Sequence, residues 1–183
     1  MQNSPFLPKN GTLITQRLVL RPLCENDRND CARILENSEI KKTYMLPDFH
    51  SSEDVSAFFE RLRNLSEDIL HYFYGIFFCD KLIGFINDVE IDDKSIEVGY
   101  VIHPDYHNNG FATEALRSLT AELFRMGFHC VKCGYFQGNE ASRRVMVKSG
   151  MRKIDYEDDI AYRGELRHCL YYAIEKTDTS IEK

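Results

Sequence analysis

One stretch in the middle of the chain restricts the fold most, because its hydrophobic period changes across a short loop. Residues 96–103 alternate between apolar and more polar side chains, as a half-buried strand does. Residues 107–110 read His-Asn-Asn-Gly and form a loop. From residue 111 to the glycine at 127, apolar side chains recur every three or four positions, as on one face of a helix. The chain must therefore contain a β-loop-α unit.

The flanking segments extend this unit into a mixed α/β sandwich. We expect, in chain order, a strand at 17–22, helices at 26–35 and 51–62, strands at 72–79, 82–91 and 96–103, a helix from 111, a strand at 131–136, a helix from 139, and strands at 151–156 and 167–174. Composition shows no break between them. We expect a single domain at 12–176, an N-terminal arm at 1–11 and a polar tail at 177–183.

Charge and hydropathy narrow the function classes. The 23 Lys and Arg residues against 29 Asp and Glu residues give a net charge of −6. An acidic chain without a basic block is a poor nucleic-acid binder and suits a cationic or amine substrate better. The N-terminus lacks the pattern of a secretory signal, and the longest strongly apolar run, 72–79, is far shorter than the about 20 residues of a membrane span. We expect a cytoplasmic protein with reduced cysteines and no membrane partner.

A zinc site at the Cys130 and Cys133 pair is not expected. These residues lie in the predicted strand at 131–136 or beside it, so an odd spacing directs them to opposite faces. A second CxxC is missing from the sequence. We predict buried or half-buried thiols and no metal.

The loop and the start of the following helix, residues 107–113, suit a pyrophosphate. Free N–H groups and the helix dipole favour an anion there, and Gly110 lets a ligand approach the backbone closely. A simple strand-to-helix turn is the alternative. The sequence has no GxxxxGK[ST] loop, no GxGxxG after a strand and no GxSxG elbow.

Four further motifs accompany this loop. They are TQRLVLRP at 15–22, EVGY at 97–100, TEAL at 113–116, and NEAS at 139–142 followed by KSGM at 148–151. Together with HNNGFA at 107–112 they resemble the GNAT acetyltransferases of the ribosomal-protein N-acetyltransferase (RimJ/RimL-like) type. The resemblance runs from about residue 12 to 175. It implies the GNAT fold, a mostly antiparallel twisted sheet of about seven strands flanked by about four helices.

The resemblance also implies a reaction and a set of coenzyme-binding residues. An acetyl group would pass from acetyl-CoA, as co-substrate, to a primary amine by direct attack in a ternary complex. Pantetheine would pair with the backbone of a strand and bond to an asparagine, and the pyrophosphate would lie on the loop. The implied coenzyme-binding residues are Tyr100, Val101, Ile102, His107, Asn108, Asn109, Gly110, Phe111, Ala112, Thr113 and Asn139.

Two residues are implied as catalytic. Glu97 is the candidate base that deprotonates the amine, against the alternative of a solvated or salt-bridged side chain. Ser142 is the candidate partner of the coenzyme sulfur, against the alternative of a helix cap, which also applies to Asn139. Arg143 and Arg144 either meet the 3′-phosphate or form a solvated helix face.

The sequence departs from the family pattern at two places. His107 stands where Gln or Arg is usual, and residues 145–147 read Val-Met-Val where many relatives carry the tyrosine that protonates the thiolate. These departures keep open the alternative of a non-catalytic acyl-CoA-binding module. The acceptor also stays open: a protein N-terminal amine, a polyamine, an amino acid or an aminoglycoside-like amine. Residues 41–49 are expected on the acceptor side, and the family allows a homodimer.

Overall fold

The computed structural model describes residues 11–177 of the chain. The predicted arm at 1–11 and tail at 177–183 lie outside the described residues, apart from Gly11 and Thr177.

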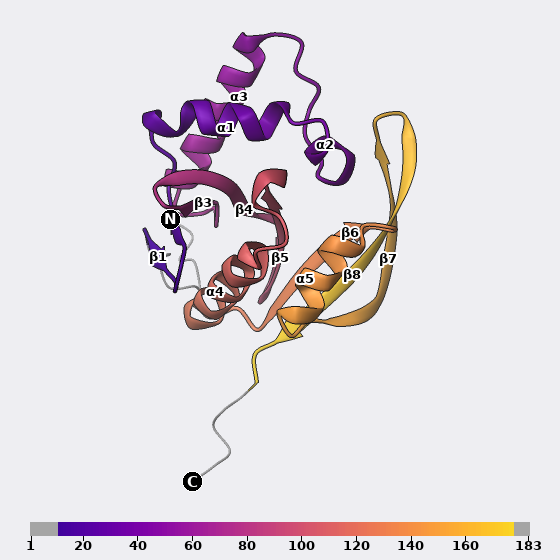
Figure 1. Ribbon diagram of the computed structural model, residues 1–183. Helices are drawn as coiled ribbons and strands as arrows, with labels where there is room; N and C mark the ends of the chain where they lie inside the picture. Colours follow the sequence, from indigo (N-terminus) through magenta and orange to yellow (C-terminus); the bar gives the residue numbers. More distant parts are fainter. Residues whose placement is uncertain (1–10, 178–183) are drawn as a thin grey trace.

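The centre of the molecule is one eight-stranded sheet with the order β1-β2-β3-β4-β5-β6-β8-β7 (Figure 1). The strands are β1 (Leu13–Ile14), β2 (Val19–Arg21), β3 (Tyr74–Phe78), β4 (Lys81–Asp92), β5 (Ser95–Ile102), β6 (Cys130–Phe136), β7 (Arg152–Tyr162) and β8 (Glu165–Glu175). Every neighbouring pair is antiparallel except β5 and β6, which run parallel. The α4 helix (Phe111–Met126) connects these two, so the predicted β-loop-α unit forms a parallel crossover. A second crossover, through α5 (Glu140–Lys148), joins β6 to β7 around β8.

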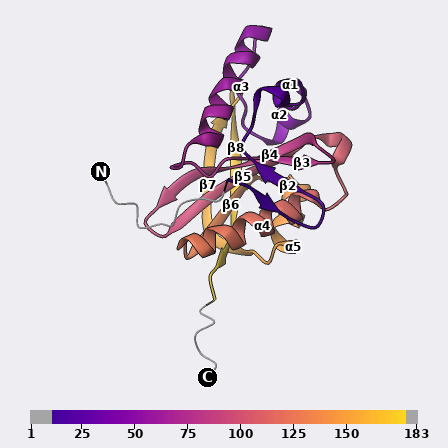
Figure 2. The same ribbon diagram turned by 90° about the vertical axis from the view of Figure 1, so that its left-hand side faces the viewer.

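Helices cover both faces of this sheet (Figure 2). They are α1 (Arg28–Glu36), α2 (Ile40–Thr43), α3 (Ser52–Glu67), α4 (Phe111–Met126) and α5 (Glu140–Lys148), with short 3₁₀ turns η1 (Glu25–Asp27) and η2 (Pro104–Tyr106). The first three lie on one face, and α4 and α5 lie on the other. Within residues 11–177, every helix is too short or too polar to span a membrane.

Each face of the sheet has its own hydrophobic core. Leu116, Leu119 and Leu123 of α4 are fully buried against alternate residues of β5, which include Ile96 and Val98. The other core joins α1 and α3 to β3 and β4. Strand alternation thus divides β5 between the two cores, and this division later separates the functional side chains.

Ser51 is the N-cap of α3. Its Oγ accepts a hydrogen bond from the Asp54 amide at 3.2 Å, and the Asp54 carboxylate accepts one from the Ser51 amide at 3.2 Å. This reciprocal pair satisfies donors that the first helical turn leaves open. The aromatic run at 72–78 also belongs to the core, with Tyr72, Phe73, Tyr74 and Phe77 buried.

The mixed α/β prediction is confirmed, with three differences in detail. Two elements were not predicted: β1, which pairs with β2 over two positions, and α2, which spans one turn. Both are too short for a hydrophobic period to reveal them. In addition, β7 runs to Tyr162, beyond the predicted end at 156. An acidic run at 155–159 hides its alternation, because the strand is exposed over most of its length.

Candidate active site

The β5 and β6 strands part in the middle of the sheet. Their parallel pairing covers three positions, from Ser95 opposite Cys130 to Glu97 opposite Lys132. Beyond them, residues 98–102 of β5 and 134–136 of β6 line a cavity of about 530 Å³. A bulge at Val89 of β4 lies beside this point and adds local twist. The sheet therefore opens where the backbone of both strands is accessible to a ligand.

The loop before α4 and the first turn of that helix close one end of the cavity. Residues 106–108 and 110–113 line it. Gly110 is the N-cap with φ of 79°, and no side chain caps the helix. The first N–H groups of a 16-residue helix thus remain open at the cavity, where the helix dipole favours an anion. This geometry suits a phosphate group.

Arg17 holds this loop from the start of the sheet. Its guanidinium donates to the carbonyl of Asn109 at 2.9 Å and pairs with Glu114 of α4 at 2.7 Å. It also lies over the Phe111 ring, 4.6 Å from the centroid. The sequence analysis missed Arg17, because a polar residue in the turn between β1 and β2 looks like any solvent-facing position. Nothing in the local pattern indicates a contact across more than 90 positions.

Two loop side chains differ in how they relate to the cavity. The His107 Nε2 atom lies 2.8 Å from the carbonyl oxygen of Ile102, so the ring joins the end of β5 to the loop. Asn109 does not line the cavity, unlike its predicted neighbours. Its amide donates to the carbonyls of Tyr106 and His107 at 3.2 and 2.9 Å. The Asn109 side chain therefore builds the turn, and its expected role as a coenzyme donor stays a prediction.

Cationic side chains of α5 face the same end of the cavity. Arg144 and Lys148, one helical turn apart, both line it. Arg143 pairs instead with Glu140 at 2.7 Å. Of the two arginines named from the sequence, only Arg144 belongs to the site. Lys148 was missed, although its spacing of four from Arg144 is a usable signal.

Two hydroxyl groups meet on the α4 and α5 side of the sheet. Ser142 of α5 places its Oγ 2.8 Å from the Tyr100 hydroxyl of β5. Burial raises the pKa of the Tyr100 phenol, which stays protonated. Asn139 caps α5, because its Oδ1 accepts from the Ser142 amide at 3.2 Å. All three residues line the cavity. The predicted use of Tyr100 involved its backbone, so this phenol is a feature that sequence reasoning missed.

Glu97 approaches the cavity from the opposite face. It alternates with Ile96 and Val98, which point into the core under α4. Within residues 11–177, no hydrogen bond or ion pair to its carboxylate is found. Burial raises the pKa of the Glu97 carboxyl, and the negative charges of Glu90 and Asp158 raise it further. The positive charge of Lys132 acts in the opposite direction but does not outweigh them. A half-buried, unpaired carboxylate with a raised pKa is suited to accept a proton.

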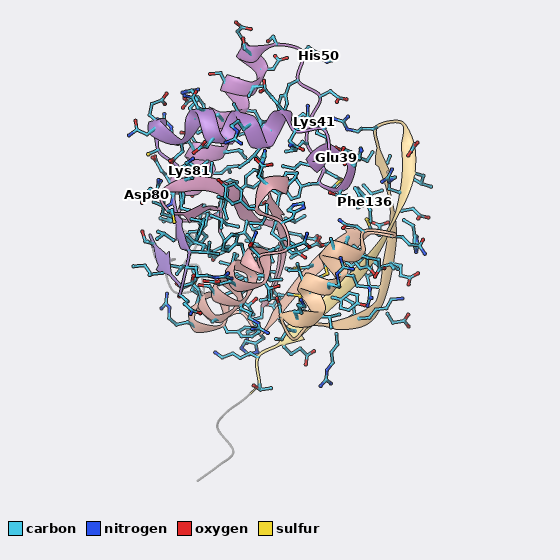
Figure 3. All side chains as sticks on the ribbon, viewed as in Figure 1. Glu39, Lys41, His50, Asp80, Lys81 and Phe136 are labelled. Atoms are coloured by element: carbon cyan, nitrogen blue, oxygen red, sulfur yellow. The ribbon has the colours of Figure 1, made fainter. Side chains whose placement is uncertain are left out.

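The α2 segment and the β7–β8 hairpin enclose the Glu97 side of the cavity. Thr43, Tyr44 and Met45 line it from the predicted 41–49 region. The Tyr44 hydroxyl donates to Asn87 at 2.5 Å. Glu39, which precedes α2, and Phe136 at the end of β6 also line the cavity and lie at the same end of the molecule, remote from the β3–β4 turn at Asp80 (Figure 3).

Tyr162 fixes this enclosure. Its hydroxyl oxygen lies 2.8 Å from the Lys41 carbonyl and accepts from the Leu46 amide at 3.3 Å. Arg163 adds an ion pair to Asp48. The hairpin thus positions a one-turn helix that has little packing of its own.

The structure brings together all but one of the predicted site residues. Those that line the cavity are Glu97, Tyr100, Val101, Ile102, His107, Asn108, Gly110, Phe111, Ala112, Thr113, Asn139 and Ser142. Cys133 is buried in the core and Cys130 lies on the other face of β6. Residues 11–177 contain no group of three or more His, Cys, Asp and Glu side chains that could hold a metal.

Comparison with known proteins gives the same fold. The acetyltransferase (GNAT) domain family matches residues 17–152. YoaA of Bacillus subtilis (strain 168), called an uncharacterized N-acetyltransferase, is 28% identical over 174 residues, 92% of this chain and 93% of YoaA. A GNAT-family acetyltransferase from Bacillus anthracis superposes with a TM-score of 0.76 at 23% identity, covering 90% of this chain and 98% of that one. The ribosomal-protein-S5-alanine acetyltransferase from Vibrio fischeri gives a TM-score of 0.77 at 16% identity, with 92% and 98% covered.

The family match covers well over half of the chain, and the fold agrees with it. The expectation of acetyl-CoA as co-substrate rests on this family and not on any single motif. The chain belongs to the GNAT family of acetyltransferases, which take their acetyl group from acetyl-CoA.

Proposed function

We propose that this protein transfers an acetyl group from acetyl-CoA to a primary amine by direct attack in a ternary complex. One observation carries the proposal. A single cavity extends from the uncapped N-terminus of α4 to Glu97, through the opening between β5 and β6. An anionic coenzyme and a cationic amine can therefore meet in the sheet from its two faces.

The residues around the opening match the parts of acetyl-CoA. The pyrophosphate would lie on the N–H groups of residues 110–113, near Arg144 and Lys148. The pantetheine amides would pair with the open edge of β5 at residues 100–102. Asn139 uses its Oδ1 as a cap, which leaves its Nδ2 as the group to donate to the arm.

The reaction needs a base for the amine and groups that stabilise two negative charges, on the carbonyl oxygen and on the departing sulfur. Glu97 takes a proton from the ammonium, and the amine nitrogen then attacks the thioester carbon. A backbone N–H of β5 stabilises the oxyanion, a kind of contact worth about 3 kcal/mol. The C–S bond then breaks, its electron pair stays on sulfur, and the Ser142 hydroxyl donates to the thiolate. A cysteine nucleophile is not part of this scheme, because burial raises the pKa of the Cys169 thiol to about 11.

A protein N-terminal amine is the acceptor that we favour. The Vibrio fischeri neighbour is named for acetylating an alanine of ribosomal protein S5. Glu39 and Glu97 line the acceptor side and attract a cation. Small amines such as polyamines satisfy the same charges and stay as the alternative. A cytoplasmic location and a homodimer also stay predictions.

Thermal unfolding with saturating acetyl-CoA, against ATP and NAD as controls, tests the coenzyme. At 100 times its dissociation constant a ligand stabilises by about 2.7 kcal/mol, a readily measured shift. Release of the CoA thiol with peptides of free N-terminus, and with polyamines, then tests transfer. Binding without release would point to a non-catalytic acyl-CoA-binding module, and no specific shift would contradict the proposal.

Arg144→Ala is expected to weaken acetyl-CoA binding about fivefold, since an exposed ion pair contributes about 1 kcal/mol or less. Titration calorimetry at low and high salt measures it, and the loss should shrink in high salt. Arg143→Ala removes the same charge one position away, outside the cavity. Equal losses in the two variants would mean that only net charge matters and that Arg144 makes no direct contact.

A further inference from the structure

The hydroxyl groups of Tyr100 and Ser142 form a hydrogen-bonded pair that the packing of the core does not require. The Tyr100 oxygen lies 2.8 Å from Ser142 Oγ and 3.1 Å from the Ser142 carbonyl oxygen. The two residues are 42 positions apart, on β5 and α5, and both line the cavity at the opening of the sheet. The chain therefore brings a phenol and an alcohol together on the coenzyme side, opposite to Glu97.

Their hydrogens have two arrangements. In one, the phenol donates to the Ser142 carbonyl and the serine hydroxyl donates to the phenol oxygen. In the other, the phenol donates to Ser142 Oγ, and the serine hydrogen is free to point into the cavity. An anion in the cavity selects the second arrangement, because only then does the pair present a donor to it.

We propose that Tyr100 is a positioning residue that holds the Ser142 hydroxyl as a donor toward the departing CoA thiolate. The inference rests on the proposed function and adds a residue that the family pattern does not supply at residues 145–147. The pair takes over the stabilisation of the leaving group in a chain that lacks a tyrosine on α5.

The proton balance needs no loss of a proton from Tyr100. When the C–S bond breaks, its electron pair goes to sulfur, and the two hydroxyls stabilise that charge by hydrogen bonds. The ammonium gives up two protons in all. One ends on sulfur through solvent, and the other leaves Glu97 for solvent. Burial keeps the pKa of Tyr100 raised, so the phenol stays a donor throughout.

The thiol pKa of bound CoA reports how strongly the Ser142 hydroxyl stabilises the thiolate, and its measurement does not require the acceptor amine to be known. The ultraviolet absorbance of the thiolate is titrated on the protein with CoA, and the same titration with desulfo-CoA is subtracted to remove the protein thiols. In the wild type we expect the bound thiol pKa to fall by about one unit, a tenfold change in its acid dissociation constant. Tyr100→Phe keeps the ring and its packing, and should remove most of this fall.

Three further variants complete the design. Ser142→Ala should abolish the shift, and the double variant should equal Ser142→Ala, since the phenol acts through the serine. Tyr72→Phe is the control, because Tyr72 is buried against Phe128 away from the cavity, and it should leave the shift intact. With an amine acceptor, Tyr100→Phe should lower kcat about tenfold and leave the KM for acetyl-CoA unchanged.

The outcomes separate this inference from the function it rests on. If the wild-type protein binds CoA without lowering the thiol pKa, the positioning role of Tyr100 is overturned and the proposed function still stands. The same holds if Tyr100→Phe keeps the full shift. If the protein does not bind CoA at all, the proposed function and the positioning role of Tyr100 are overturned together.

Discussion

Gly110→Leu is expected to weaken acetyl-CoA binding about a hundredfold, or about 2.7 kcal/mol. Gly110 is the N-cap of α4 and lines the cavity at the end that suits a phosphate. A side chain there separates the ligand from the open N–H groups of the first turn. A Cβ would also lie 3.6 Å from the Arg17 guanidinium, so a larger group displaces the residue that holds the loop. Calorimetric titration with acetyl-CoA measures the loss.

The backbone strain of this variant needs a matched control. Gly110 has a φ of 79°, which costs a leucine about 1 kcal/mol or more in the folded state. Gly164, in the β7–β8 turn, has a φ of 77° and no atom within 4 Å of an added Cβ. Gly164→Leu should lose similar stability in urea and keep its affinity. If both variants bind acetyl-CoA as the wild type does, the anion site is not at this loop.

The central β-loop-α unit was predictable because its strand and helix are long enough for their hydrophobic patterns to repeat. The α4 helix spans 16 residues and β5 spans eight, so each repeats its pattern several times. The same alternation already places Glu97 and Tyr100 on opposite faces of β5. The α2 helix, with four residues, has no such pattern, and Tyr162 of a distant hairpin decides its position.

Contacts between distant segments were not predictable from a single sequence. Arg17 reaches Asn109 and Glu114 across the fold, and Tyr100 reaches Ser142 from another element. Periodicity describes only how one element presents its own residues. Most of the residues that the family pattern named line the cavity, whereas the side chain of Asn109 bonds within the turn.

The opening of the sheet explains why these residues work from two sides. A fully paired β5 and β6 would satisfy their backbone groups and keep the two faces apart. Because pairing ends at Glu97, the carboxylate stands at the last paired position, next to the gap. The base and the hydroxyl pair therefore lie on opposite faces of β5 yet line one cavity. This arrangement orders the reaction: the amine approaches from the Glu97 face and the thiolate leaves toward Ser142.

Glu97→Gln is expected to lower kcat by about a hundredfold to ten-thousandfold, the usual contribution of a positioned base. Acetyl-CoA affinity should not change, because the anion site lies at the other end of the cavity. The wild-type rate should rise with pH through the Glu97 pKa, since only the carboxylate accepts a proton. Burial raises that pKa, so the acidic limb lies above the range of an ordinary glutamate. In the variant this limb should disappear from the profile of kcat/KM against pH.

Glu90→Gln tests the same assignment through the electrostatics of the site. Glu90 lies opposite Glu97 on β4, is exposed, and raises the pKa of Glu97 by its charge. Its neutralisation should move the acidic limb to lower pH and keep the maximal rate, because the repulsion on the Glu97 carboxylate falls. A general base elsewhere would respond differently: Glu97→Gln would keep the limb, and Glu90→Gln would leave its midpoint unchanged. A moved limb in Glu90→Gln together with a lost limb in Glu97→Gln identifies the titrating group as Glu97, since no other carboxyl satisfies both results.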